Sequence, residues 1–254
     1  MSADFTVVFA LYPNITQLDF TGPYEVFIRM PAARCVLASI GGGTIEVDGG
    51  MRIAGIEDLE NVDSCALLCV PGGLGTIQAM EERRYLAQLR RLAASARYVT
   101  SVCTGSLLLA AAGLLTGKRA ACHWAWRDSL AAFGAIPDPG RVVRDGNIFS
   151  GGGVTAGIDM ALTVLAEIAG PDHAQAVQLG IEYNPMPPFD SGSPERARPK
   201  IVAAVRKRAD AMSAEREAAV RRAAAALARG QLLPSVEATR TARNSSADRS
   251  GSIE

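Results

Sequence analysis

The segment Tyr98-Val-Thr-Ser-Val-Cys103-Thr-Gly-Ser106 joins two kinds of secondary structure within nine residues. Tyr98–Val102 is an apolar, β-branched run, which is typical of a strand buried on both faces of a parallel sheet. The stretch from Thr104 to Leu115 is apolar and long enough to form a buried helix. We therefore predict a strand that turns directly into a helix at Cys103.

The same alternation of strands and helices runs through the rest of the chain. Further strands are predicted at Phe5–Leu11, Cys35–Ile40 and Ala66–Val70, and further helices at Thr16–Met30, Glu81–Ala96 and Thr155–Ala169. The first of these helices is expected to be interrupted early by Gly22-Pro23. Val142–Phe149 predicts a β-hairpin, because Asp145-Gly146 separates two short β-prone pieces. The pattern indicates an α/β fold with a doubly wound, mostly parallel, flavodoxin-like sheet sandwiched by helices.

The composition is that of a globular protein. Of the 254 residues, 48% are hydrophobic and 20% are charged, which excludes disorder of the whole chain. No run of about 18 uncharged apolar residues occurs, so no membrane association is expected. Before its first apolar run the chain has Asp4 and no Lys or Arg, unlike a secretory signal. Five cysteines without CxxC spacing fit reduced thiols, so we expect a cytoplasmic protein.

Metal and nucleotide chemistry find no support in the motifs. The chain has two histidines, and neither has further ligands at the spacing of a metal site. No glycine-rich nucleotide-binding loop occurs. We therefore predict no metal and no cofactor.

Charge divides the chain in two. Residues 1–194 hold 13 Lys and Arg against 19 Asp and Glu, whereas residues 195–254 hold 13 against 7. The chain is predicted to comprise a folded domain, a basic Ala/Arg helical extension and a flexible tail, at residues 1–198, 199–233 and 234–254. The extension is predicted as one helix over about Pro199 to Arg229. Acidic residues interrupt this helix and no helix-turn-helix follows it, so nucleic-acid binding is not expected.

Three loops should carry the candidate site, because open α/β sheets bind ligands beyond the carboxyl ends of their strands. They are Tyr12–Phe20, Pro71–Thr76 and Val102–Ser106. In the third loop, small residues stand two places before and after Cys103, as a strained nucleophile elbow requires. The helix that follows places the positive end of its dipole at the sulfur, which favours a thiolate.

The magnitude of this effect decides what else the thiol needs. Nearly complete ionisation at pH 7 requires a pKa lowered by about three units, or about 4 kcal/mol, of which a helix terminus supplies about 1 kcal/mol. Further hydrogen bonds must supply the rest, and Thr104 is the nearest candidate donor. We therefore predict that Cys103 is an ionised nucleophile. The other four cysteines are predicted to be small core residues.

The other two loops supply further candidate groups. Gly72 and Gly73 offer backbone N–H groups that a ligand can approach closely, the material of an oxyanion-type site. Asp19 follows the first strand in an apolar setting, which raises the pKa of a carboxyl toward a value useful for proton transfer. A helix-capping role for Asp19 and a competing role for Glu25 are alternatives.

Six segments together resemble the ThiJ/PfpI superfamily and, within it, the isonitrile (isocyanide) hydratase family. They are residues 14–27, Pro71-Gly-Gly73, Val102-Cys-Thr-Gly-Ser106, Cys122-His-Trp124, residues 150–159 and residues 183–189. The resemblance covers about residues 4–200 and leaves the basic extension unmatched. The elbow and the glycine loop are features of the whole superfamily. The more specific features are Asp19, where many relatives carry Glu, and a Thr directly after the cysteine.

The resemblance implies a site and a reaction. Cys103 is the nucleophile, Asp19 the acid/base carboxylate and Thr104 the assisting hydroxyl, in a catalytic domain at residues 1–198. His123 is expected near the nucleophile, in a substrate-contacting, structural or catalytic role. The implied partners are a small isonitrile, water and a second copy of the chain in a homodimer. An isonitrile carbon accepts a soft thiolate, and the thioimidate that results is cleaved by water to an N-substituted formamide.

Two other functions use the same residues. A glyoxalase-like or deglycase-like enzyme would employ the Cys103 thiol on small aldehydes, so turnover of methylglyoxal distinguishes it from turnover of an isonitrile. A non-enzymatic regulator would sense a ligand or the oxidation of Cys103. The basic extension motivates the second alternative, and salt-dependent retention of nucleic acid is its test.

Overall fold

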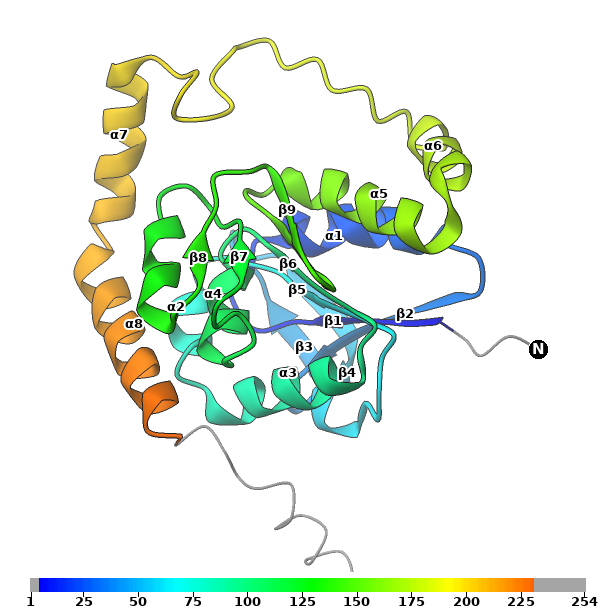
Figure 1. Ribbon diagram of the computed structural model, residues 1–254, viewed down its shortest axis with the longest axis horizontal. Helices are drawn as coiled ribbons and strands as arrows, with labels where there is room; N and C mark the ends of the chain where they lie inside the picture. The colour runs from blue at the N-terminus through cyan, green and yellow to red at the C-terminus, as the bar shows by residue number, and fades with distance from the viewer. Residues whose placement is uncertain (1–4, 231–254) are drawn as a thin grey trace, which may run out of the picture.

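An eight-stranded β-sheet runs through the middle of the protein, whose computed structural model describes residues 5–230 (Figure 1). In spatial order the strands are β3 (Gly43–Glu46), β4 (Arg52–Asp58), β2 (Ala33–Ser39), β1 (Phe5–Ala10), β5 (Leu67–Val70), β6 (Tyr98–Val102), β10 (Ile148–Gly151) and β9 (Val142–Asp145). In this spatial order, the strands between the two edges run parallel to one another, whereas the edge strands β3 and β9 run antiparallel to their neighbours. The predicted doubly wound, mostly parallel sheet is confirmed.

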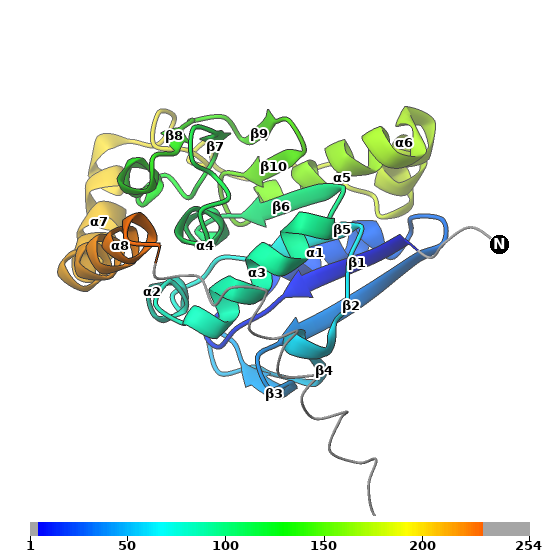
Figure 2. The same cartoon turned by 60° about the horizontal axis from the view of Figure 1, so that its bottom comes forward.

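Helices cover both faces of this sheet (Figure 2). On one face α1 (Gln17–Phe27) packs against α5 (Ala156–Ala169), and on the other α3 (Arg83–Ser95) packs against α4 (Gly105–Ala111). Because both faces are covered, every residue of β5 and β6 is buried, as their unbroken apolar sequences predicted. Within residues 5–230 no helix is both long and apolar enough to cross a bilayer.

The carboxyl ends of three central strands meet at one edge of the sheet. β5 lies between β1 and β6 and is parallel to both, so the loops that follow these strands are neighbours. Ile15 forms an isolated bridge with Gly73, and the Thr16 N–H donates to the Gly72 carbonyl over 2.9 Å. The three loops singled out in the sequence therefore come together at the predicted edge.

Helix α1 differs from its prediction at Gly22-Pro23. The helix is shorter than Thr16–Met30, and it continues through these two residues instead of being interrupted there. A Cβ atom on Gly22 would lie 3.0 Å from Cγ1 of Ile158 in α5, so glycine permits the close approach of the two helices. This packing supports α1 across a proline that donates no backbone hydrogen bond.

Some elements carry too weak a pattern to be predicted. They are the β3–β4 hairpin and a small sheet of β7 (Arg119–Ala120) and β8 (Ile136–Pro137). The helix α6 (Pro171–Gly180) begins at Pro171-Asp172, where the sequence predicts a helix start. β3 and β4 lie at the sheet edge and are largely exposed, so they lack a continuous apolar run. The hairpin predicted at Val142–Phe149 is confirmed as β9 and β10.

The basic extension forms two helices instead of the single one predicted. α7 (Pro199–Asp210) buries no residue, whereas α8 (Ser213–Ala228) buries Arg216, Ala219, Val220 and Ala223 along one face. This face packs against α2 (Thr76–Ala79), α4 and the 3-10 helix η2 (Arg127–Phe133). The chain turns between the two helices because only α8 carries a stripe that the domain can bury. Residues 231–233 of the predicted extension and the predicted tail lie outside the described residues.

Candidate active site

Cys103 occupies the turn between β6 and α4 with a φ of +57°, a left-handed conformation that non-glycine residues rarely adopt. Its N–H donates to the Gly151 carbonyl over 2.9 Å, which ties the turn to β10. A Cβ atom on Gly105 would lie 2.2 Å from the Val70 carbonyl oxygen, so only glycine fits two places after the cysteine. The strained elbow predicted from the sequence is therefore confirmed in its geometry.

Asp19 lies in the first turn of α1 and is completely buried. Its Oδ2 accepts the Gly72 N–H over 2.9 Å, so the side chain reaches across to the next loop and does not cap its own helix. The carboxyl neighbours the thiol of Cys103 closely enough for the two groups to shift each other's pKa. Oδ1 has no hydrogen-bond partner among the described residues. The alternative carboxylate, Glu25, is exposed and forms an ion pair with Arg29 over 2.7 Å.

The two glycines hold the site together through hydrogen bonds that sequence reasoning assigned to a ligand. The Gly72 N–H is taken by Asp19, and the Gly73 N–H donates to Oγ1 of Thr104 over 2.9 Å. A Cβ atom on Gly72 would lie 2.5 Å from the Thr104 nitrogen and 2.8 Å from Oδ2 of Asp19. Gly72 is therefore required so that the Asp19 and Cys103 loops can approach each other.

Thr104 makes two kinds of contact. Its backbone N–H adjoins the Cys103 sulfur and lowers the pKa of the thiol, as expected at the start of a helix. Its hydroxyl lies 2.8 Å from the Thr76 hydroxyl, which in turn lies 3.0 Å from the Tyr12 hydroxyl. Tyr12 donates to the Pro71 carbonyl over 2.8 Å, which closes a buried network.

Sequence reasoning missed Thr76 and Tyr12 as members of the site. Both residues lie inside the loops Tyr12–Phe20 and Pro71–Thr76, which were predicted to contribute. Their hydroxyl groups carry no motif, because a hydroxyl at the end of a buried strand is also an ordinary structural feature. Only their mutual distance of 3.0 Å shows that they connect the first and second loops to Thr104.

Burial decides the protonation of the nucleophile and its neighbour. The pKa of Asp19 is raised to about 7, chiefly because the carboxyl is desolvated, although the hydrogen bond from Gly72 and the neighbouring Cys103 thiol act in the opposite direction. Burial, reinforced by the charge of Asp19, raises the pKa of the Cys103 thiol well above its usual value. The resting thiolate predicted for Cys103 is therefore wrong. The Thr104 N–H favours the thiolate, but this effect is smaller than the loss of hydration.

A cavity of about 290 Å³ lies next to the elbow and includes Cys122, His123, Trp124, Gly152 and Ser193 in its wall. Gly152 follows the residue whose carbonyl accepts the Cys103 N–H, and a charge on Cys122 would raise the pKa of Cys103. Nδ1 of His123 accepts the Ala125 N–H over 3.3 Å, and burial lowers the pKa of the imidazole. His123 is therefore a neutral ring with its proton on Nε2, at the wall of the cavity.

The remaining cysteines behave as core residues. Cys65, Cys69 and Cys122 are buried and Cys35 is half-buried, and none of the five cysteines is in a disulfide. Burial raises the pKa of Cys35 to about 11 and that of the other three to about 12, so they are poor nucleophiles at neutral pH. Within residues 5–230 no group of three or more His, Cys, Asp and Glu side chains is arranged to hold a metal ion.

A strained cysteine elbow on a doubly wound sheet, facing a buried carboxyl, defines a class of proteins. The sequence profile of the DJ-1/PfpI family matches residues 5–167, and this chain belongs to that family. Within the family, the chain is 49% identical over 219 residues to the isonitrile hydratase of Pseudomonas putida, a match that covers 86% of this chain and 96% of that protein.

Two further relatives delimit what the family alone implies. The crystal structure of a ThiJ/PfpI family protein from Pseudomonas syringae matches with a TM-score of 0.83 at 36% identity and covers 86% of this chain and 91% of that one. The HTH-type transcriptional regulator CdhR of Pseudomonas aeruginosa is 31% identical over 192 residues, a match that covers 72% of this chain and 55% of the regulator. Family membership is therefore compatible with both enzymes and regulators.

Proposed function

We propose that this protein is an isonitrile hydratase, a lyase that converts R–N≡C and water into R–NH–CHO through a thioimidate on Cys103. The observation that carries the proposal is the pairing of two buried neighbours, the Cys103 thiol at the strained elbow and the Asp19 carboxyl. The 49% identity to the isonitrile hydratase of Pseudomonas putida supports the choice of substrate class.

The first step joins sulfur to the isonitrile carbon. Asp19, with a pKa of about 7, is present in part as the carboxylate at neutral pH and takes the thiol proton as the sulfur attacks. The developing thiolate receives the hydrogen bond of the Thr104 N–H. Asp19 then delivers the proton to the same carbon, which gives R–N=CH–S–Cys103. Because the carboxyl and the sulfur are buried neighbours, the proton moves only a short distance.

The second step adds water and releases the sulfur. The Asp19 carboxylate takes a proton from water as its oxygen bonds to the thioimidate carbon, and the proton passes to the substrate nitrogen. The carbon–sulfur bond then breaks, the formamide C=O forms, and the hydroxyl proton returns through Asp19 to the sulfur. Atoms and charges balance without any metal or cofactor. His123, neutral and protonated on Nε2, lines the cavity that would receive the substrate.

The hydrogen-bond network around Thr104 holds Cys103 and Asp19 in position relative to each other. The Thr104 hydroxyl is held by the Gly73 N–H and by Thr76, so the turn that carries Cys103 cannot shift without breaking buried hydrogen bonds. The Gly72 N–H holds Asp19 in place in the same way, through its hydrogen bond to the carboxylate oxygen Oδ2. In this proposal Cys103 and Asp19 are catalytic, Thr104 acts through its N–H, and the glycines are positioning residues.

The proposal includes the setting in which the enzyme works. We assign catalysis to a domain of residues 1–198, which the basic extension 199–233 and the tail 234–254 follow. A homodimer is proposed, since the loop after α6 exposes Met186 and Phe189 almost fully. A cytoplasmic location is proposed because all five cysteines are free thiols. Sedimentation equilibrium tests the dimer.

The decisive experiment measures formamide formation from an alkyl and an aryl isonitrile. We expect turnover by the wild-type protein, complete loss in Cys103→Ala, and wild-type rates in Cys35→Ala, which removes a half-buried thiol elsewhere. Acid quenching of the wild-type protein during turnover should trap the thioimidate. Mass spectrometry should then find the added mass of the substrate on the peptide that contains Cys103. Full activity of Cys103→Ala, or turnover of methylglyoxal but not of either isonitrile, would overturn the proposal.

A further inference from the structure

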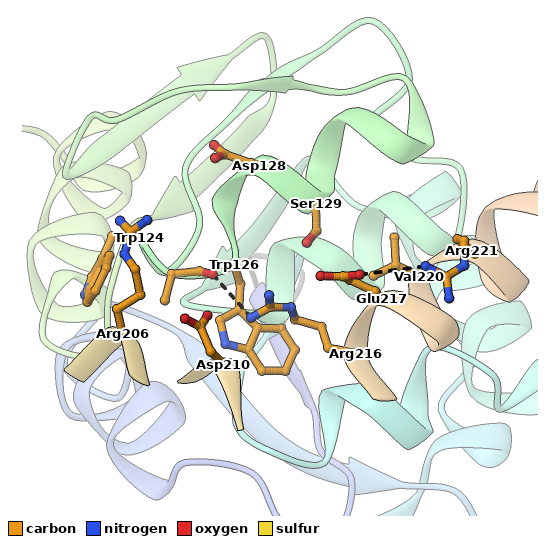
Figure 3. Close-up of a pocket in the computed structure, with 11 residues that line it drawn as sticks. Trp124, Trp126, Asp128, Ser129, Arg206, Asp210, Arg216, Glu217, Val220 and Arg221 are labelled. Atoms are coloured by element: carbon orange, nitrogen blue, oxygen red, sulfur yellow. Dashed lines mark hydrogen bonds and ion pairs between the residues drawn. The ribbon is translucent and has the colours of Figure 1, made fainter. Parts of the chain in front are cut away.

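A second cavity, of about 420 Å³, separates α8 and the end of α7 from the segment 124–129 (Figure 3). Its walls include the aromatic rings of Trp124 and Trp126, and α8 contributes Arg216. The volume is within the range of small-molecule sites. Trp124 also lines the cavity beside Cys103, whereas the reaction proposed above uses neither Trp126 nor Arg216.

Arg216 is the unusual feature of this cavity. The residue is only 8% exposed, and its guanidinium lies over the Trp126 ring with 5.1 Å between the guanidinium carbon and the ring centroid. One amino group donates to the Ala125 carbonyl over 3.4 Å, and Nε has no hydrogen-bond partner among the described residues. Arg216 also forms no ion pair with any residue between 5 and 230.

A buried guanidinium without a counter-charge is energetically unfavourable and attracts an anion. Buried charges in proteins are ordinarily paired, because hydration is lost and only a nearby opposite charge replaces it. The stacking on Trp126 and one long hydrogen bond replace part of that hydration. The unused donors of a planar guanidinium suit a carboxylate in particular, since the two groups match in geometry.

The surroundings favour a singly charged ligand with a flat apolar body. Apart from Arg216, the cavity wall carries Asp128, Asp210 and Glu217 against Arg206 and Arg221, and this net negative charge opposes a dianion such as a phosphate ester. Trp124 is half-buried with Arg206 over its ring, and Trp126 is buried beneath Arg216, so the tryptophans offer an apolar wall that an aromatic ring can contact. We propose that this cavity binds a small aryl carboxylate, whose carboxylate pairs with Arg216 and whose ring packs against the wall formed by Trp124 and Trp126.

The protein carries its own reporter for this test. Trp124 and Trp126 are the only tryptophans in the chain, and both line the cavity, so intrinsic fluorescence reads its occupancy. Trp124 also lines the cavity beside Cys103, and Trp124→Phe leaves Trp126 as the single reporter. Titration of the full chain with phenylacetate should give a saturable change in both proteins. The measurement does not require turnover at Cys103, so its result is independent of the proposed reaction.

Matched ligands and variants assign the binding to Arg216. We expect Arg216→Met to weaken phenylacetate binding at least about tenfold, the usual effect of losing a charge-assisted hydrogen bond. Arg222→Met makes the same change on the same helix at an exposed arginine paired with Glu81, and it should bind like the wild type. Arg216→Lys, which keeps the charge without the planar fork, should be intermediate.

Two ligand controls need no variant, so the proposal stays testable if Arg216→Met does not fold. Phenylacetamide has the same shape without the charge and should bind at least about tenfold more weakly than phenylacetate. Phenyl phosphate should also bind more weakly. Absence of saturation with phenylacetate up to about 10 mM, equal binding of phenylacetamide, tighter binding of phenyl phosphate, or wild-type affinity in a folded Arg216→Met protein would each overturn the proposal.

Discussion

The carboxyl of Asp19 and the thiol of Cys103 are buried neighbours that shift each other's pKa, although the two residues follow different strands of the sheet. Burial raises the pKa of both groups, and the charge of Asp19 makes ionisation of the thiol still less favourable. The pair therefore loses its first proton near pH 7 and its second far above that value. This order of titration means that, from about pH 7 upward, the pair shares one proton, which can move between carboxylate and sulfur.

Activity should depend on pH through Asp19. Below pH 7 the carboxyl is protonated and cannot accept the thiol proton, so kcat/KM for isonitrile hydration should fall about tenfold per pH unit. Above pH 7 it should reach a plateau. Steady-state rates between pH 5 and pH 9 measure this, and any residual activity of Asp19→Asn should lack the rising limb. A flat wild-type profile from pH 5 to pH 8 would contradict the role of Asp19.

Stability should respond to the same carboxyl in the opposite direction. The folded-state pKa of Asp19 is about 7 and its ordinary value is 3.8, so the folded state holds a proton that the unfolded state releases between these pH values. The free energy of unfolding should therefore fall as the pH rises through this window, by up to about 4 kcal/mol from this group. Above pH 7 the penalty is constant.

Asp19→Asn isolates that contribution because the amide has a similar shape and no charge. Relative to the wild type, the variant should gain stability between pH 4 and pH 8, by up to about 4 kcal/mol. Urea unfolding at the two pH values measures the difference, which cancels any pH-independent cost of the amide. An equal stability difference at pH 4 and pH 8 would show that Asp19 is not desolvated.

Gly72→Ala should abolish activity because the added methyl group has no space. Its Cβ would lie 2.5 Å from the backbone nitrogen of Thr104, so the loop carrying Asp19 and the elbow carrying Cys103 must separate. Gly180→Ala, at the end of α6, meets no atom within 4 Å and is the matched control. Isonitrile turnover and thermal melting of both variants provide the measurements. Wild-type rates in Gly72→Ala would mean that this close approach is unnecessary.

Thr76→Val should uncouple the hydroxyl network from the elbow. The substitution preserves the shape and removes the contacts with Thr104 and Tyr12, at a cost to stability of about 1–3 kcal/mol because buried hydroxyls lose a partner. We also expect a lower kcat. Thr163→Val removes an exposed hydroxyl that bonds to the Asp159 carbonyl, and it should change stability by less than about 1 kcal/mol. Equal stabilities of the two variants would contradict the network.

The sequence predicted the buried strands correctly and missed the exposed ones. β1, β5 and β6 are continuous apolar runs because both of their faces are covered, and such runs are visible in a sequence. The edge strand β3 and its neighbour β4 are largely exposed, and their alternation is too weak to distinguish them from a loop. The single helix predicted for the extension became two because the packing of α8 on α2 and η2 outweighs helix propensity.

The chain's local chemistry determined the elbow at Cys103, the carboxyl at Asp19 and the glycines beside them, because steric limits at a tight turn act between near neighbours in sequence. Tertiary structure alone decided that Thr76 and Tyr12 join the site, that the N–H groups of Gly72 and Gly73 hold side chains, and that the resting sulfur is a thiol. Hydration is the reason for the difference. How much water a group loses depends on every segment packed around it, and no local pattern records that sum.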